Sequence, residues 1–383
     1  MSLNRIIARG RVAAAVWLTG ILMLSGCGGN PSGPTSAESA SEDMTGTTQE
    51  AVTAAPAVEE EQKLSTETAR VGICLSDDSG GDNERLLNEL ERTMIQQGFA
   101  EENLVISEMT RSRSAQRRSV EDCLADGCSL LIVSAVSDAR IGEIADMVHE
   151  AGAAVLFVNC QPGEDEIQRW KEEQINAVWL GSTYAQHLAC QMSILYDWSG
   201  TERGLDFNGD GHIGTLLIGG GEEARGVLEE TIRDLGSDLQ ILGEMDEGPA
   251  EEITSYTEEI INEHRKDTEL ILCSSEDALE AAADGVQLRH RLVGRDILVI
   301  GVGAHEDTCT GIINKLISGS TFTDFYEQAN LAAVAARDMI EGNQREKTIS
   351  DVIFKVTEEN AQEVLDQLWK TKNDNGSRED GED

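Results

Sequence analysis

Aromatic and basic residues are scarce in this chain of 383 residues. Phenylalanine, tryptophan and tyrosine make up 4% of it, and 30 lysines and arginines stand against 71 aspartates and glutamates. A nucleic-acid surface needs a basic stripe, so the formal net charge of −41 excludes that class of partner. The acidic excess is typical of a strongly solvated exterior. The 40% of hydrophobic residues still suffices to bury one or two cores.

Long apolar runs are also lacking. The run at 12–24 is too short to span a membrane comfortably. Three arginines precede it and Leu-Ser-Gly-Cys (24–27) follows, which is the order of an export signal. Its end resembles the lipobox of bacterial lipoproteins. The resemblance implies cleavage before Cys27, lipidation of that thiol, and an extracytoplasmic protein anchored to the cell membrane by lipid. An ordinary signal peptide or anchor helix is the alternative.

Sequence patterns of several common sites are missing as well. Seven cysteines follow Cys27, and none has the CxxC or Cys/His spacing of a zinc site. An odd number cannot all pair, and a Cys123–Cys128 disulfide stays open. The glycine run at 218–225 lacks the lysine and Ser/Thr of a phosphate-binding loop. No GxSxG motif occurs and the six histidines are scattered, so nothing indicates a hydrolytic triad.

What the chain does have is a regular alternation of strands and helices. Residues 28–66 are rich in Gly, Ser, Thr, Ala, Pro and Glu and predict a disordered tether. From residue 70, short apolar runs alternate with amphipathic segments. Strands are expected at 71–75, 103–107, 129–136, 153–159 and 177–181, then at 213–219, 239–244, 269–274, 297–302, 319–324 and 351–356. This alternation predicts parallel sheets with helices on both faces.

Two such sets predict an α/β fold of two doubly wound parallel-sheet lobes with a hinge and an interlobe cleft. The predicted divisions are a signal segment 1–27, a tether 28–66, an N-lobe 67–182, a C-lobe 183–321, a return to the N-lobe at 322–348, a return to the C-lobe at 349–370, and a disordered tail 371–383. Ligands of such sheets bind at the carboxyl ends of the strands.

The segment 206–214 has the first half of an EF-hand calcium loop. Its oxygen donors are Asp206, Asn208, Asp210 and the backbone carbonyl of His212. Position nine is Gly214, which has no side chain, and position twelve is Leu217, where a bidentate glutamate belongs. A closing carboxylate must therefore come from elsewhere in the chain. An Asx-rich turn that closes without metal is the alternative.

Taken in order, several segments resemble type I periplasmic binding proteins, most closely the galactose/glucose-binding group of ABC sugar transporters. They are 69–75, 153–162, 177–183, 205–214, 268–282, 297–304 and 320–333. In that family a glutamate at the start of a later C-lobe strand completes the calcium loop, and the matching residue is Glu269. The resemblance thus implies a structural calcium site of Asp206, Asn208, Asp210, His212 and Glu269.

The sugar-reading residues of the family transfer poorly. No aromatic residue stands where the family stacks a hexose between two rings, and Gly303 takes the place of an aspartate. The candidate ligand-binding residues are Arg225, Asp78, Ser134, Ser275 and Thr323, with Asp77, Asp82, Asp138 and Glu276 as further cleft candidates. For the acids the alternative is a solvated surface carboxylate, and for Arg225 a surface ion pair. An unaltered glucose or galactose site is not expected.

The resemblance implies a monomeric solute-binding lipoprotein that closes about its hinge on a small polar ligand, a sugar or sugar derivative, and delivers it to an ABC permease. No bond is made or broken, so no enzyme activity is expected. The alternative is a sensor that presents its liganded form to a chemoreceptor or two-component receptor in the membrane. A repressor of the same fold needs an N-terminal helix-turn-helix, and an enzyme of this fold is the remaining option.

Overall fold

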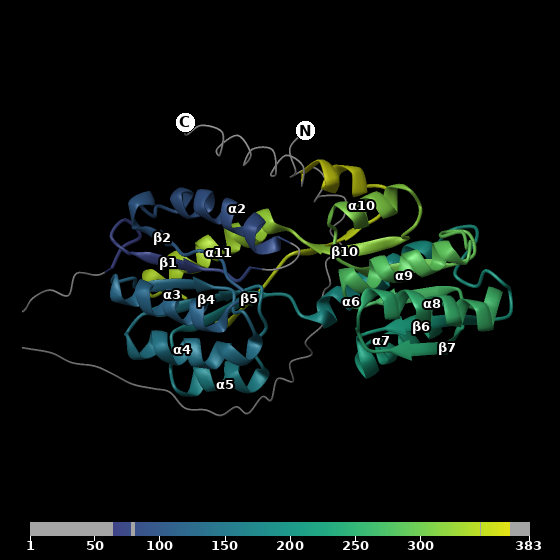
Figure 1. Ribbon diagram of the computed structural model, residues 1–383, viewed down its shortest axis with the longest axis horizontal. Coiled ribbons are helices and arrows are strands. Elements are labelled where there is room, and N and C mark those ends of the chain that lie inside the picture. Colours follow the sequence, from purple (N-terminus) through teal and green to yellow (C-terminus); the bar gives the residue numbers. More distant parts are fainter. Residues whose placement is uncertain (1–63, 78–80, 345, 368–383) are drawn as a thin grey trace, which may run out of the picture. The chain divides into compact units, whose positions relative to one another are not determined.

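The computed structural model describes residues 64–77, 81–344 and 346–367 (Figure 1). The predicted signal segment with Cys27, nearly all of the tether, the candidate Asp78 and the tail lie outside these residues. Among the helices described, none combines the length and the apolar character needed to cross a membrane.

The first sheet is wholly parallel. It has the strand order β11-β5-β4-β3-β1-β2. Its strands are β1 (Val71–Cys74), β2 (Leu104–Ile106), β3 (Leu130–Val133), β4 (Ala154–Val158), β5 (Ala177–Gly181) and β11 (Thr348–Ser350). The helices that belong with it are α2 (Asp82–Gln96), α3 (Arg113–Ala125), α4 (Ile141–Glu150), α5 (Glu164–Glu172) and α11 (Phe325–Ile340).

The second sheet has the order β12-β10-β9-β8-β6-β7, and only its β10–β12 pair is antiparallel. Its strands are β6 (His212–Ile218), β7 (Asp238–Met245), β8 (Leu270–Cys273), β9 (Leu298–Val302), β10 (Gly319–Thr323) and β12 (Ile353–Val356). The helices of this lobe are α6 (Tyr184–Ser199), α7 (Gly221–Asp234), α8 (Ala250–His264), α9 (Glu276–Leu288) and α10 (Glu306–Ile313). The predicted two-lobed α/β architecture is confirmed.

The strands are apolar throughout because each sheet is covered on both faces. Successive residues of a strand point to opposite faces, so Leu156 packs in one core of the first sheet and Phe157 in the other. In the second sheet, Leu216 and Leu217 divide between two cores in the same way. This is why the strands read as continuous hydrophobic runs rather than as an alternating pattern.

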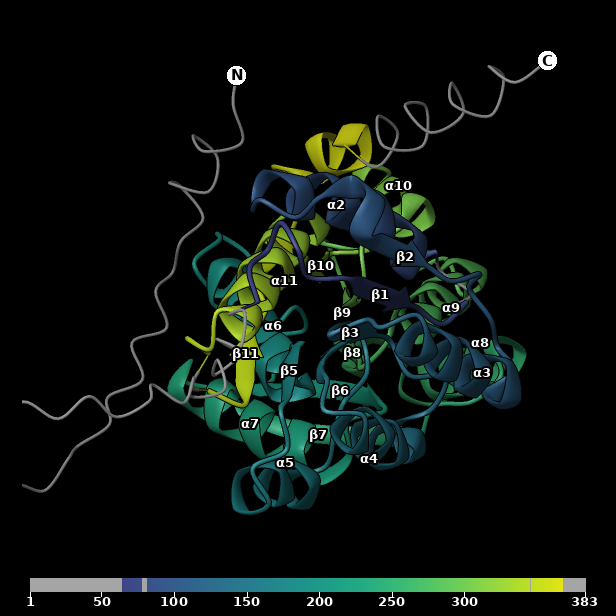
Figure 2. The same ribbon diagram turned by 90° about the vertical axis from the view of Figure 1, so that its left-hand side faces the viewer.

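The last part of the chain returns to both sheets. Helix α11 follows β10 of the second sheet, yet it packs against α2 and β4 of the first (Figures 1 and 2). Strand β11 then extends the first sheet and β12 the second. The final crossing therefore lies between Ser350 and Ile353.

Three elements were not expected from the sequence: α5, α10 and β11. Helix α5 has the acidic sequence EDEIQRWKE and buries only Trp170, so it lacks a readable apolar stripe. Strand β11 has three residues, of which Ile349 alone is partly buried, so it carries almost no pattern. The strand expected at 351–356 begins at Ile353. The predicted final helix is present from 361 to 367, where the description stops.

The seven cysteines that the structure describes are free thiols. Cys74, Cys123 and Cys128 are buried together in the first lobe, and the Sγ atoms of Cys74 and Cys123 lie 3.7 Å apart. The Cys123–Cys128 bridge, left open by the sequence, is not formed.

Candidate functional site

A chain of polar side chains lies along the carboxyl edge of the first sheet. Asn83, at the start of α2, donates from Nδ2 to the Ser76 carbonyl oxygen at 2.9 Å and to Ser134 Oγ at 3.1 Å. Ser76 Oγ and Ser134 Oγ are 3.0 Å apart. Asn159, just after β4, donates from Nδ2 to Asn83 Oδ1 at 2.9 Å. Residues from three strand ends are thus joined by hydrogen bonds.

Asn159 is the most exposed member of this chain. Its φ of 47° lies in the left-handed region, which asparagine tolerates better than most residues. Such backbone conformations gather at functional sites. Its amide can both donate to a ligand and accept from one. Asn159 is not among the residues predicted from the sequence, although an asparagine directly after a buried parallel strand is a signal that could have found it.

Two buried side chains continue the chain beyond Asn159. Gln328 on α11 donates from Nε2 to Asn159 Oδ1 and to Asp351 Oδ2, both at 2.8 Å. Gln328 is 1% exposed and Asp351 is 8% exposed. Burial raises the pKa of the Asp351 carboxyl to about 6, although its bond from Gln328 acts in the opposite direction.

At the carboxyl edge of the second sheet, Glu276 holds His305. The His305 ring Nδ1 lies 2.6 Å from Glu276 Oε2, and its backbone N–H donates to Oε1 at 2.6 Å. The ring Nε2 lies 2.8 Å from Oδ1 of Asp82, at the start of α2. Burial opposes a charge on His305, but the two carboxylates outweigh it and raise its pKa to about 10. Two candidate acids from different lobes are thus brought together by a histidine that the sequence analysis left unassigned.

The glycine run at the end of β6 permits close packing at the same edge. Gly219, Gly220 and Gly221 all have positive φ, at 72°, 76° and 51°. A Cβ at Gly219 would lie 1.8 Å from Ser274 Oγ, and one at Gly220 would lie 2.5 Å from Tyr184 Oη. The Ser274 hydroxyl donates to Glu247. The run that resembled a phosphate loop therefore admits Tyr184, Ser274 and Glu247 beside the strand ends.

Several predicted ligand residues are engaged with the protein itself. Ser134 is fully buried, so it supports the polar chain from behind and has no open approach for a ligand in this structure. Arg225 forms an ion pair with Glu244, with 48% of the arginine side chain exposed. Ser275 caps α9 by accepting from the Ala278 N–H at 3.4 Å.

The remaining candidates lie at strand ends. Asp77 pairs with Arg111 at 3.0 Å, and Asp138 accepts from the Gln161 N–H at 3.0 Å. Thr323 ends β10 and is only partly buried. None of these positions is yet tied to a ligand, and they stay predictions.

The segment 206–214 folds around its own carboxylates and is closed by Glu269. Asp206 accepts the N–H groups of Gly209 and Gly211, at 2.7 and 2.9 Å. Glu269, 1% exposed, accepts from the Asn208 N–H at 2.9 Å and the Gly214 N–H at 3.4 Å. Burial raises the Glu269 pKa to about 7 against the effect of these N–H donors. The predicted partnership between this loop and Glu269 is present.

The ninth loop position cannot carry a side chain. A Cβ at Gly214 would lie 1.6 Å from the Asp267 carbonyl oxygen. Among the residues described, no three acidic, histidine or cysteine side chains gather as metal ligands. The donor chemistry fits calcium, which takes carboxylate, amide and carbonyl oxygens, and the buried Glu269 carboxylate faces the loop. A water must then serve at position nine, because Asp267 fills the space of a side chain.

His187 links Ser182, just after β5 of the first sheet, to Thr321, in the middle of β10 of the second sheet. Its Nε2 lies 3.0 Å from Ser182 Oγ, after β5, and its Nδ1 lies 2.9 Å from Thr321 Oγ1, on β10. Burial lowers the pKa of His187 to about 4, so the ring is neutral at pH 7.

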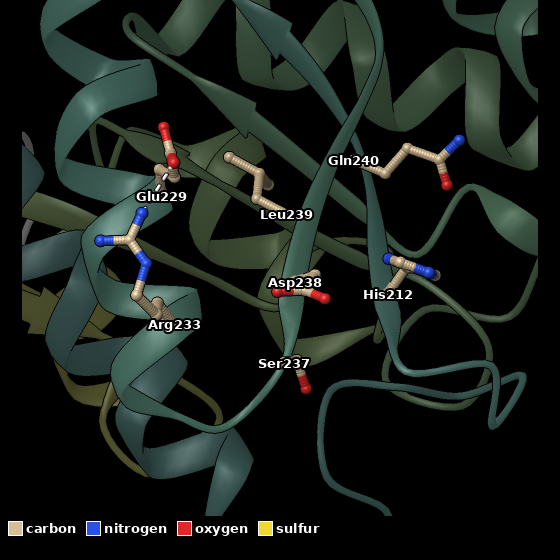
Figure 3. Close-up of a pocket in the computed structure, with 7 residues that line it drawn as sticks. All are labelled: His212, Glu229, Arg233, Ser237, Asp238, Leu239 and Gln240. Carbon is tan, nitrogen blue, oxygen red and sulfur yellow. Dashed lines mark hydrogen bonds and ion pairs between the residues drawn. The ribbon is translucent and has the colours of Figure 1, made fainter.

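A surface hollow lies at the opposite edge of the second sheet (Figure 3). It is lined by His212, Glu229, Arg233, Ser237, Asp238, Leu239 and Gln240. His212 and Asp238 are the first residues of β6 and β7, so the hollow marks the amino ends of these strands. Because ligands of open α/β sheets bind at the carboxyl ends, this hollow is not the candidate site.

Solved structures share this arrangement of two lobes. A periplasmic ribose ABC transporter protein from Conexibacter woesei is 18% identical, with a TM-score of 0.65 over 80% of this chain and 98% of its own. The chain has the fold of the type I periplasmic binding proteins. No protein-family model and no curated protein sequence matches it.

Two further structures with this fold were solved with a bound polyol or sugar. The Caulobacter myo-inositol binding protein, bound to myo-inositol, is 17% identical, with a TM-score of 0.57 over 79% of this chain and 98% of its own. The arabinose-binding component from Shewanella, bound to L-arabinofuranose, is 14% identical, with a TM-score of 0.59 over 82% and 99%. At these identities the likeness establishes the fold.

Proposed function

We propose that this protein is an extracytoplasmic solute-binding protein that closes on a neutral sugar or polyol and delivers it to an ABC permease. One observation supports this most directly. The exposed Asn159 amide belongs to a hydrogen-bonded chain at the carboxyl edge of the first sheet, where the fold places ligands. Amide groups suit sugars because each hydroxyl both donates and accepts. No catalytic group is assigned, and no bond of the ligand changes.

The ligand class follows from charge and from the fold relatives. Glu247, Glu276 and Asp82 line the facing strand ends, and the cations described beside them, Arg85 and His305, are already paired with carboxylates. An anionic sugar would therefore meet repulsion. The structural relatives are a ribose transporter protein, a myo-inositol binding protein and an arabinose-binding component, which supports a neutral sugar or polyol as the ligand.

Closure would use contacts between the lobes. Asp82 from the first lobe already meets His305 from the second at 2.8 Å. A ligand held by Asn159 on one side and by groups such as Glu247 on the other would stabilise the closed arrangement, because it contacts both lobes only in that state. No feature of the described residues favours a sensor over transport.

Two further parts of the proposal concern anchoring and calcium. Cys27 would carry the lipid anchor, and a Cys27→Ala chain that still partitions with membranes would refute this. Calcium would be held by Asp206, Asn208, Asp210, the His212 carbonyl and Glu269. When bound, it would tie the loop 206–214 to the start of β8 and stiffen the second lobe.

The function is tested by calorimetry with D-ribose, L-arabinose, myo-inositol, D-galactose and glucose 6-phosphate. We expect a neutral polyol to bind, and we expect Asn159→Ala to weaken it at least tenfold. Asp122→Asn, an exposed change on α3 of the same lobe, should leave the affinity unchanged. Binding of the phosphate ester alone, or an affinity indifferent to Asn159, would contradict the proposal.

A further inference from the structure

The hydrogen bonds along the polar chain of the first lobe all run in the same direction, from donor to acceptor. Gln328 Nε2 donates to Asn159, Asn159 Nδ2 donates to Asn83, and Asn83 Nδ2 donates to Ser134 and Ser76. Each amide thus offers its nitrogen to the next residue and its oxygen to the one before. The direction leads from α11 to the ends of β4, β3 and β1.

The chain lacks a donor at its beginning. Gln328 Nε2 has two N–H groups, and both are used, one toward Asn159 and one toward Asp351. Gln328 Oε1 and Asp351 Oδ1 are buried without a hydrogen-bond partner among the described residues. Buried polar atoms are rarely left unpaired. Here two adjacent side chains each have an unpaired acceptor, and the described residues supply no donor for either.

A single proton on Asp351 provides for both unpaired oxygen atoms. A carboxylic acid has one O–H donor, so protonation turns Asp351 Oδ1 from an unpaired acceptor into a donor for Gln328 Oε1. With the existing 2.8 Å bond from Gln328 Nε2 to Asp351 Oδ2, the acid and the carboxamide then share two hydrogen bonds in a ring.

We propose that Asp351 is a positioning residue, held as the neutral acid, whose O–H fixes the Gln328 carboxamide and thereby the orientation in which Asn159 is presented to the ligand. The part of this inference that concerns ligand binding rests on the proposed function. Asp351 lies between β11 and β12, and Gln328 lies on the helix that follows β10, so both residues belong to segments that pass between the sheets.

The surroundings of Asp351 favour the neutral form. Burial is the main influence on its pKa, which is raised to about 6, and no charged side chain among the described residues acts on it. The Asp351 N–H donates to the carbonyl oxygen of Gly181, at the end of β5, at 3.0 Å. The acids on the neighbouring turn of α11 are Asp324 and Glu327, and Asp324 caps that helix through the N–H groups of Tyr326 and Glu327. The O–H bond to Gln328 stabilises the neutral acid further.

Asp351→Asn is the matched test, because an asparagine amide can form the same two bonds with Gln328 and cannot titrate. At pH 5 the protonated-carboxyl infrared band of the full wild-type chain should exceed that of Asp351→Asn by the signal of one carboxyl group, since Glu269, with its pKa of about 7, contributes equally to both. Relative to the variant, the wild type should lose stability as pH rises from about 4 to 6, by roughly tenfold per unit in the unfolding constant. Asp122→Asn should match the wild type. A fully ionised Asp351 at pH 5, or parallel stability profiles, would overturn the proposal.

The ligand arm uses D-ribose, L-arabinose and myo-inositol as probes. The affinity of the wild type should fall several-fold between pH 5 and 8, while that of Asp351→Asn stays within twofold. Equal pH profiles in the two proteins would refute the positioning role even if the acid is neutral. If no probe binds either protein, the proposed function fails, and the infrared and stability results still decide the protonation. Should Asp351→Asn not fold, the infrared titration of the ¹³C-aspartate-labelled wild type serves in its place.

Discussion

The carboxylate of Glu276 occupies the space that a side chain at Gly303 would fill. A Cβ at Gly303 would lie 2.3 Å from Glu276 Cδ and 2.4 Å from Oε2. Gly303 also has a φ of 101°, which residues other than glycine rarely adopt. The sequence showed a lost acid at position 303, and the structure shows that a carboxylate from the start of α9 lies there instead.

Replacing Gly303 should therefore destabilise the protein. We expect Gly303→Ala to cost roughly 1–3 kcal/mol from the backbone strain alone, with more from the contact with Glu276. Urea unfolding at pH 7 measures the cost. In Gly303→Ala/Glu276→Ala the contact with the carboxylate is removed, but the Cβ of residue 276 stays 2.5 Å from that of residue 303 and the backbone strain remains. The double variant should therefore recover only part of the loss. A Gly303→Ala protein as stable as the wild type would contradict this account.

The link from His305 to Asp82 and Glu276 should show in the alkaline range. The His305 pKa is raised from 6.5 to about 10 because the two carboxylates outweigh the effect of burial. The link therefore contributes its full stability below about pH 6.5 and loses it as pH rises through about 10. The stability advantage of the wild type over His305→Gln should shrink across this range. His149→Gln, a change at an exposed histidine, should show no such trend.

His187 predicts the opposite dependence. Burial lowers its pKa from 6.5 to about 4, so folding favours the neutral ring. This contribution is present above about pH 6.5 and is lost as pH falls toward 4. Between pH 4 and 7, the melting temperature of the wild type should depend more steeply on pH than that of His187→Gln. If the two curves run parallel, folding does not lower the pKa of His187.

Introducing a side chain at the ninth loop position should lower the thermal stability of the protein. The ninth position of an EF-hand loop normally supplies a ligand, often through water, so a side-chain oxygen there would be expected to improve calcium binding. The Asp267 carbonyl, 1.6 Å from the position of such a Cβ, predicts instead that Gly214→Gln destabilises the loop. Thermal melts without calcium measure this. A stable Gly214→Gln protein with tighter calcium binding would contradict it.

Calcium itself should raise the melting temperature of the wild type over that in EDTA, because an ion that binds only the folded state stabilises it. Glu269→Gln should abolish the increase, since it removes the carboxylate that closes the loop. Asp238→Asn, outside the loop at the start of β7, should keep it. An identical melting temperature with calcium and with EDTA would leave the loop as an Asx-rich turn.

The sequence predicts most of the architecture because the buried strands are continuous apolar runs. Short or acidic elements such as β11 and α5 bury too little to leave a pattern. The partnership of Glu269 with the 206–214 loop came from the family resemblance, and it depends on the parallel pairing of β6 with β8.

The candidate ligand edge was harder to predict. Its chain joins Asn83, Asn159, Gln328 and Asp351, which are far apart in the sequence, and no local spacing relates them. Glu276 and Gly303 likewise show their relationship only once α9 and β9 are adjacent in space. Ser134, expected to face a ligand, proved to be buried because Asn83 and Ser76 cover its hydroxyl.

The late return of the chain to both sheets has a consequence for synthesis and truncation. One core of the first sheet includes Ala329, Ala332 and Ala336 of α11. One core of the second sheet includes Val356 and Ala361. A growing chain therefore has two incomplete cores until its final segment emerges, although most of the N-lobe is made first. A premature stop before residue 325 removes α11 from the first lobe and the edge strand β12 from the second lobe. We therefore expect neither lobe to fold stably in such a truncated chain.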